Sequence, residues 1–158
     1  MSEPQRRDLA FHSFDEVLAD LDQLESSGYY QLGKWNLVQL CLHLNDWMRF
    51  PMDGFPKQIL PIRVLLYLMK LMFGKSQFHK ILQSGSMKAG MPTMPETVHP
   101  ANSADRKAIV DFRQTVCRMR DHRGAIHPSP LFGEMDLDAA QRLQLIHCAH
   151  HLSFLVPK

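Results

Sequence analysis

The chain has 158 residues, of which 45% are hydrophobic and 22% are charged. This composition is that of an ordinary folded protein and excludes a disordered chain. The length favours a single domain with one core, which we expect to span residues 1–158. The formal net charge of +2 is too small to indicate binding to nucleic acid, and we expect no such partner.

Cysteine usage and the N-terminal sequence bear on the cellular compartment. Cys41, Cys117 and Cys148 lie within helical patterns and have no short paired spacing, which is typical of reduced thiols inside the cell. The first seven residues are polar and contain no apolar signal region. We therefore expect a cytoplasmic protein whose three cysteines are buried in the core.

The first half of the chain contains two segments with the apolar period of a helix. The first is expected to begin after Ser13 as N-cap, with Glu16 forming a capping box, and to end at Gly28. The second is expected to begin after Asn36, a good N-cap residue, and to be stopped by Pro51.

Two more amphipathic segments follow in the second half. One is expected from about Ser103 to His122, and the other from about Asp136, a good N-cap residue, to Leu155. The sequence has no convincing strand run, no internal repeat and no glycine-rich phosphate loop. Four long amphipathic helices predict an all-α fold, most economically a four-helix bundle.

A long crossover of about fifty residues joins the second and third helices, which allows these two helices to run parallel. It contains an apolar segment, residues 59–73, that would span only about 22 Å as a helix, less than the roughly 30 Å core of a membrane. Arg63 and Lys70 share one face of this segment. We expect an extra amphipathic helix that is no membrane anchor, covered in a homodimer or folded over the bundle mouth as a lid.

The remainder of the crossover, residues 84–102, contains three prolines and three methionines without a helical period. Structureless loops of this length are uncommon in compact domains and often serve as lids or binding loops. A surface strap that is packed by its methionines is an equally good interpretation.

Histidines in two of the helical segments suggest a metal site. His147 and His151 are four residues apart, so one turn of helix would bring both imidazoles to one ion. At about 100° per residue both fall among the inward-facing residues, whereas His150 falls on the flank. His43 falls at the boundary between the apolar and polar arcs of the second helix. Three converging histidines would bind a divalent metal and leave coordination positions open.

Two further residues are candidates for catalysis. Asp46 lies one turn from His43 and could orient that ligand or act as a general base; a solvated aspartate on the helix surface is the alternative. His127 lies in the turn before the last helix and could contact substrate or carry a proton; stabilisation of the turn is the alternative.

Three stretches of the sequence carry a resemblance to a known family. They are residues 33–37 running on to His43 and Trp47, then residues 127–135, and then residues 146–152. Together they resemble the DinB-like superfamily of metal-binding four-helix bundles. Residues 127–135, with the helix that follows, are similar to a narrower branch that is described as a domain of unknown function.

The resemblance implies a left-handed up-down-down-up bundle, often dimeric, in which one histidine of the second helix and two of the fourth hold a divalent metal. In this sequence the corresponding residues are His43, His147 and His151. Better-understood members of the superfamily include thiol-dependent S-transferases and enzymes described as metal-dependent hydrolases.

We therefore expect a metal-dependent hydrolase or thiol S-transferase that acts on a small molecule. A divalent cation lowers the pKa of bound water and stabilises a bound thiolate, so one site can serve either reaction. Ligation by imidazoles favours zinc or nickel, with iron as a further candidate. The alternative is a non-catalytic bundle that serves for dimerisation or partner binding and keeps a vestigial metal site.

Overall fold

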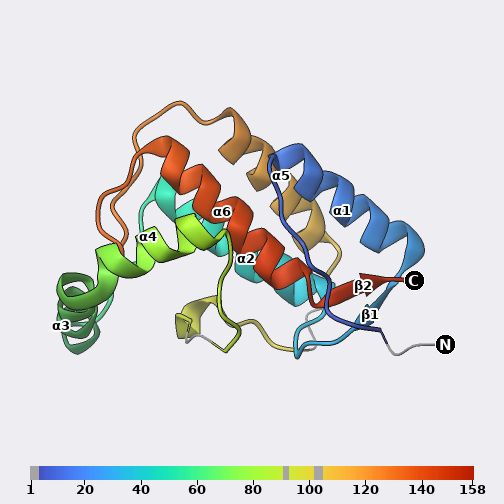
Figure 1. The fold of residues 1–158 in the computed structure, drawn as a ribbon, viewed down its shortest axis with the longest axis horizontal. Coiled ribbons are helices and arrows are strands. Elements are labelled where there is room, and N and C mark those ends of the chain that lie inside the picture. The colour runs from blue at the N-terminus through green and yellow to red at the C-terminus, as the bar shows by residue number, and fades with distance from the viewer. Residues whose placement is uncertain (1–3, 91–92, 102–104) are drawn as a thin grey trace.

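A computed structural model describes residues 4–90, 93–101 and 105–158 of the chain, which folds mainly into helices (Figure 1). In chain order the helices are α1 (Phe14–Ser27), α2 (Leu37–Asp53), α3 (Leu60–Met69), α4 (Lys75–Ser84), α5 (Lys107–Asp121) and α6 (Leu137–Leu152). The shorter elements are strand β1 (Tyr29–Gln31), the π-helical turn η1 (Lys70–Gly74), the 3-10 helix η2 (Pro95–Thr97) and strand β2 (Leu155–Pro157).

The body of the molecule consists of α1, α2, α5 and α6. Helix α2 packs against α5 and α6, and α1 packs against the same two helices. Their apolar faces enclose the main core, which includes Leu21, Leu44, Phe112 and Leu152. In Figure 1, α2 and α5 run in one direction and α1 and α6 in the opposite one, as the long crossover between α2 and α5 allows.

Local capping interactions explain where three of these helices begin. Ser13, Asn36 and Asp136 cap α1, α2 and α6, as predicted. At α2 a full capping box forms, because the side chains of Asn36 and Gln39 each accept a hydrogen bond from the other residue's backbone N–H. At α1 the Glu16 carboxylate accepts instead from the N–H of the residue before Ser13, so the predicted capping box is incomplete.

The prediction that Pro51 stops the second helix is wrong, because α2 continues to Asp53. Proline has no N–H, so the carbonyl oxygen of Trp47 loses its helical donor. The side chain of Gln144, on α6, donates a hydrogen bond from Nε2 to this oxygen at 3.2 Å. A donor from the neighbouring helix therefore replaces the one that proline lacks.

The last two helices are shorter than predicted. Helix α5 begins at Lys107, and the predicted start at Ser103 lies outside the described residues. Helix α6 ends at Leu152, three residues before its predicted end, because the following residues form β2 and pair antiparallel with β1. The expectation of no strand is thus wrong, since strands of three residues are too short to give a recognisable alternating pattern.

The apolar segment 59–73 is helical, as predicted, and forms α3 and most of η1. Helix α3 lies at the end of the molecule opposite β2 and has no buried residue (Figure 1). Helix α4 packs on α6, where Phe78 and Ile81 meet Leu143 and Ile146. Within the described part of the chain, no helix combines the length and the apolar content needed to cross a membrane.

Gly74 fixes the junction between η1 and α4. It is buried, and a Cβ atom at this position would overlap the carbonyl oxygen of Leu131. Leu131 belongs to a turn that Ser129 and Gly133 close by donating backbone hydrogen bonds to each other at 2.8 and 2.9 Å. Only glycine therefore lets the helical segment lie directly against this turn.

Candidate metal centre

Three imidazoles from two helices meet between α2 and α6, as predicted. His43 comes from α2, and His147 and His151 come from successive turns of α6. One ring nitrogen of each lies within 4.8 Å of the other two, and the Nε2 atoms of His147 and His151 are 3.0 Å apart. Two nitrogens that each lie about 2.1 Å from one ion are separated by roughly 3.0–3.4 Å. This pair therefore fits a shared ion.

The ring of His43 is oriented by the crossover. His43 is fully buried rather than at the boundary predicted for it, because the loop that contains η2 covers it. Its Nδ1 lies 2.9 Å from the carbonyl oxygen of Thr97, which can only accept, so Nδ1 carries the proton. The other nitrogen, Nε2, is then an unprotonated acceptor, and it is buried without a partner among the described residues. A cation at the cluster would satisfy this atom.

Both tryptophans of the chain border the histidines. Trp35 stacks on His151, with ring centroids 5.6 Å apart and ring planes inclined by 12°. Trp47 meets His147 edge to face at 5.9 Å. Trp47 also donates a hydrogen bond from Nε1 to the hydroxyl of Thr97 at 3.2 Å, and so holds the residue whose carbonyl orients the remaining histidine.

Burial favours the neutral form of all three imidazoles. Desolvation lowers the pKa of His43 to about 4, even though the hydrogen bond to the Thr97 carbonyl opposes this shift. Desolvation, followed by the neighbouring imidazoles, lowers the pKa of His147 and that of His151 far below the usual range. Since only a neutral imidazole can bind a metal, the cluster is in its ligating form at neutral pH.

A cavity of about 520 Å³ opens beside the three histidines. Most of its wall is apolar, with contributions from Phe55, Leu131, Phe132, Met135 and Leu143. Gln144 is a buried polar residue in this wall and is only 4% exposed. Its Nε2 is engaged with the backbone of α2, whereas its Oε1 is buried without a partner among the described residues. The cavity wall is thus mostly apolar, and the unpartnered Oε1 of its residue Gln144 is buried.

Comparison with known proteins places the chain in a family. A family model described as "Protein of unknown function (DUF1569)" matches residues 3–158. The chain belongs to this family. Membership in DUF1569 agrees with the narrower branch that the sequence resembles. No curated protein and no solved structure matches the chain.

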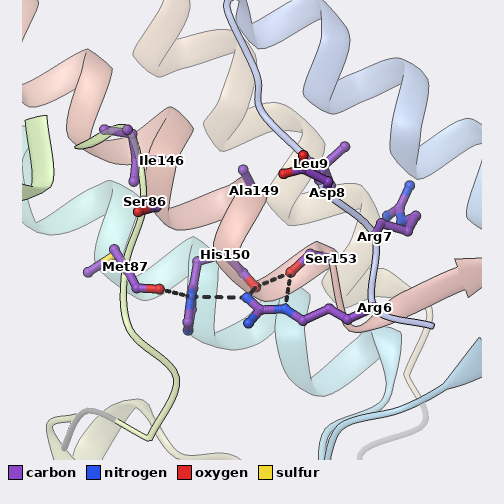
Figure 2. A pocket seen from close by; sticks show the side chains of 11 residues that line it. Arg6, Arg7, Asp8, Leu9, Ser86, Met87, Ile146, Ala149, His150 and Ser153 are labelled. Carbon is purple, nitrogen blue, oxygen red and sulfur yellow. Dashed lines mark hydrogen bonds between the residues drawn. The ribbon is translucent and has the colours of Figure 1, made fainter. Parts of the chain in front are cut away.

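In this DUF1569 protein, His150 stays out of the histidine cluster, as its position on the helix flank predicts. Figure 2 shows the second pocket that it borders, a hollow of about 350 Å³ beside the N-terminal segment. The Nδ1 atom of His150 lies 3.0 Å from the Met87 carbonyl oxygen. Arg6 donates hydrogen bonds to the His150 carbonyl and to the hydroxyl of Ser153, at 3.2 and 2.9 Å. His150 therefore links α6 to the crossover and the N-terminal segment.

Part of the crossover loop, residues 84–102, borders the cavity. Residues 87–90 and Thr93 line the cavity, and η2 covers His43; Met91 and Pro92 lie outside the described residues. The apolar segment 59–73, which precedes this loop, does not border the cavity. Among the described residues, none from 57 to 86 lines it, so α3 does not form the lid that was one of the two arrangements expected for this segment.

The two candidate catalytic residues lie outside the cavity wall that the described residues form. Asp46 Oδ2 and His99 Nε2 are 2.8 Å apart and both side chains are partly exposed, so this pair fastens the crossover to α2. The ring of His127 is exposed beside Gly54, and its backbone N–H donates to the Pro51 carbonyl at 2.8 Å. The placement of His127 accords with its turn-stabilising alternative.

Three contributors to the site were not among the predicted site residues. Gln144 lies three residues before His147 on α6, a spacing that places both on one helix face and could have indicated its role. Trp35 lies in one of the stretches that carry the DinB-like resemblance. That resemblance pointed to this part of the chain, but it did not indicate that Trp35 stacks on His151. Thr97 acts through its backbone carbonyl, and the residue type gives no signal for that.

Proposed function

We propose that this DUF1569 protein is a divalent-metal-dependent enzyme of the DinB-like type, with His43, His147 and His151 as the metal ligands. One observation carries the proposal: three imidazoles, one buried and two partly buried, converge beside an apolar cavity, and the Nε2 of His43 has no partner among the described residues. Burying this nitrogen without a partner costs free energy, which a bound cation would offset. Three ligands leave coordination positions open for water or substrate.

A divalent cation held by these residues would lower the pKa of a water or thiol at the open positions. The chain's own groups bind and orient the substrate. The apolar wall takes up a hydrocarbon or aromatic part of it and excludes water. We infer a small, largely apolar substrate.

Hydrolysis and thiol transfer are both compatible with this site. In either case the chain's own cysteines are not the reacting thiols. None of the three lines the cavity that the described residues form, and Cys41 and Cys148 are buried. Burial raises the pKa of the Cys41 thiol to about 12 and also raises that of Cys148. A thiol used in the reaction would therefore belong to a second substrate. The imidazole ligands favour zinc or nickel as the ion.

Metal analysis of protein purified without a histidine tag tests the proposal. About one equivalent of one metal per chain is expected, and His43→Ala should lose it. Because Trp35 and Trp47 border the ligands, adding nickel to the metal-free protein should quench their fluorescence. Absence of bound metal and of quenching in excess zinc or nickel would instead favour a non-catalytic bundle that binds a partner.

A further inference from the structure

The segment of residues 59–73 is an apolar surface that the rest of the described chain leaves uncovered. Eleven of the fifteen exposed large hydrophobic side chains of the described chain lie in it. Among them, Leu60 is 70% exposed, Met72 is 69% exposed and Leu65 is 57% exposed. Exposed apolar surface concentrated in this way marks an interaction site.

The same region carries a one-sided charge. Between Asp53 and Glu96 the sequence contains six basic residues and no acidic residue, although the whole chain has 18 basic and 16 acidic residues. None of the six forms an ion pair within the part of the chain that the structure describes. The six residues are Lys57, Arg63, Lys70, Lys75, Lys80 and Lys88.

The exposed apolar side chains and the one-sided basic charge together indicate what binds to this surface. In a two-fold dimer through residues 59–73, two basic segments would face each other without a carboxylate of their own to pair with. An anionic lipid surface accepts both properties, because apolar side chains enter the boundary between headgroups and acyl chains while basic side chains meet lipid phosphates. We propose that residues 59–73 dock this protein on an anionic membrane surface, with α3 lying in the plane of the interface.

The fold permits this contact without rearrangement. Helix α3 lies at the extremity of the molecule, so the helices of the body do not stand between it and a flat surface (Figure 1). Its base is fixed, because Gly74 lies against the turn around Leu131 and α4 packs on α6 through Phe78. As a ten-residue helix it is about 15 Å long, which suits lying in an interface and not spanning a bilayer.

Co-sedimentation with lipid vesicles tests the proposal. The protein should bind vesicles that contain roughly a third phosphatidylglycerol, should not bind pure phosphatidylcholine, and should be released by salt. Arg63→Gln should weaken binding about five-fold, the effect expected of one basic side chain near such a surface. Leu65→Glu should abolish binding. Val110→Glu, at a 52% exposed apolar position on α5, is the matched control and should bind as the parent does.

Light scattering at micromolar concentration tests whether a second copy of this chain covers the surface instead. We expect a monomer in the absence of lipid. A dimer that Leu65→Glu dissociates, without vesicle binding by the parent, would assign the surface to a second copy of this chain and overturn the proposal. A monomer that binds neither kind of vesicle, or binds both equally and independently of Arg63, would overturn it as well. Circular dichroism of each variant checks that the fold is intact.

Discussion

Gln144 of α6 donates a hydrogen bond from Nε2 to the backbone carbonyl of Trp47 in α2, at 3.2 Å. This is the oxygen that Pro51 leaves without a helical donor. The bond also fixes the orientation of the amide, because Nε2 must face the carbonyl, so that Oε1 is the atom left without a partner in the cavity wall. One proline in α2 thus determines which polar atom of the Gln144 amide is left without a partner among the described residues.

A double-mutant cycle tests this relationship. Gln144→Ala leaves the Trp47 carbonyl unpaired and should lower the free energy of unfolding by about 1–3 kcal/mol. Pro51→Ala restores an N–H that can donate to the same oxygen. In the Pro51→Ala background, Gln144→Ala should therefore cost at least about 1 kcal/mol less. Urea unfolding of the four proteins gives the values, and strictly additive costs would show that the two residues are not coupled.

Metal should stabilise the fold through the three proposed ligands. At a concentration of about a hundred times the dissociation constant, zinc or nickel should add roughly 2.7 kcal/mol to the free energy of unfolding. His147→Ala should remove most of this gain. His150→Ala is the matched control on the same helix and should keep it, since that ring is engaged with the Met87 carbonyl. Melting curves with and without metal measure the gain; an equal loss in both variants would mean that the ligand pair is misassigned.

Asp53 makes stability depend on pH in the acid range. Its hydrogen bonds to the guanidinium of Arg118 lower the pKa of the carboxyl from 3.8 to about 2. Because the folded-state pKa is the lower one, the carboxylate stabilises the fold above pH 3.8, and this contribution is lost as the pH falls towards 2. The Asp53 side chain is 32% exposed, so solvent screening limits the contribution to less than about 1 kcal/mol.

Asp53→Asn should therefore flatten the decline in stability between pH 3.8 and about 2. Urea unfolding at a series of pH values measures this decline. Asp111→Asn provides the comparison, since Asp111 is paired only with Lys107 one turn away among the described residues of the same helix. If both variants follow the parent curve, the link between α2 and α5 contributes nothing measurable.

The three thiols should differ in reactivity. Cys41 and Cys148 are buried, and burial raises the pKa of both, whereas Cys117 on α5 is only partly buried. An aromatic disulfide reagent should modify one thiol per folded chain, and all three after unfolding in urea. Cys117→Ser should remove the reactive thiol. Rapid modification of Cys148 in the folded protein would contradict its burial next to His147.

Sequence reasoning recovered the parts of this molecule that depend on neighbours along the chain. The cap at Asn36 requires only residues within one turn, and the pair His147 and His151 requires only the helical period. Periodicity also identified the apolar crossover helix. These features were predicted because a single helix determines them.

The remaining features arise where separate segments meet. The burial of His43 depends on the loop that brings the Thr97 carbonyl to its ring, 54 residues further along the chain. The passage of α2 beyond Pro51 depends on Gln144, on another helix. The pairing of β1 with β2 joins the segment between α1 and α2 to the segment that follows α6. In each case the outcome depends on a contact with a residue far along the chain. The local sequence pattern does not specify that contact.

The π-helical turn η1 sets the rotational phase between α3 and α4. A π-helical turn holds one residue more than the α-helical turn that it replaces. If the same residues formed a regular α-helix instead, the extra residue would turn α3 by about 100° around its axis relative to α4. Arg63 would then point in another direction from Lys75, although the sequence of the segment would be unchanged. The width of this one turn, and not its chemistry, therefore sets the direction in which α3 faces relative to α4.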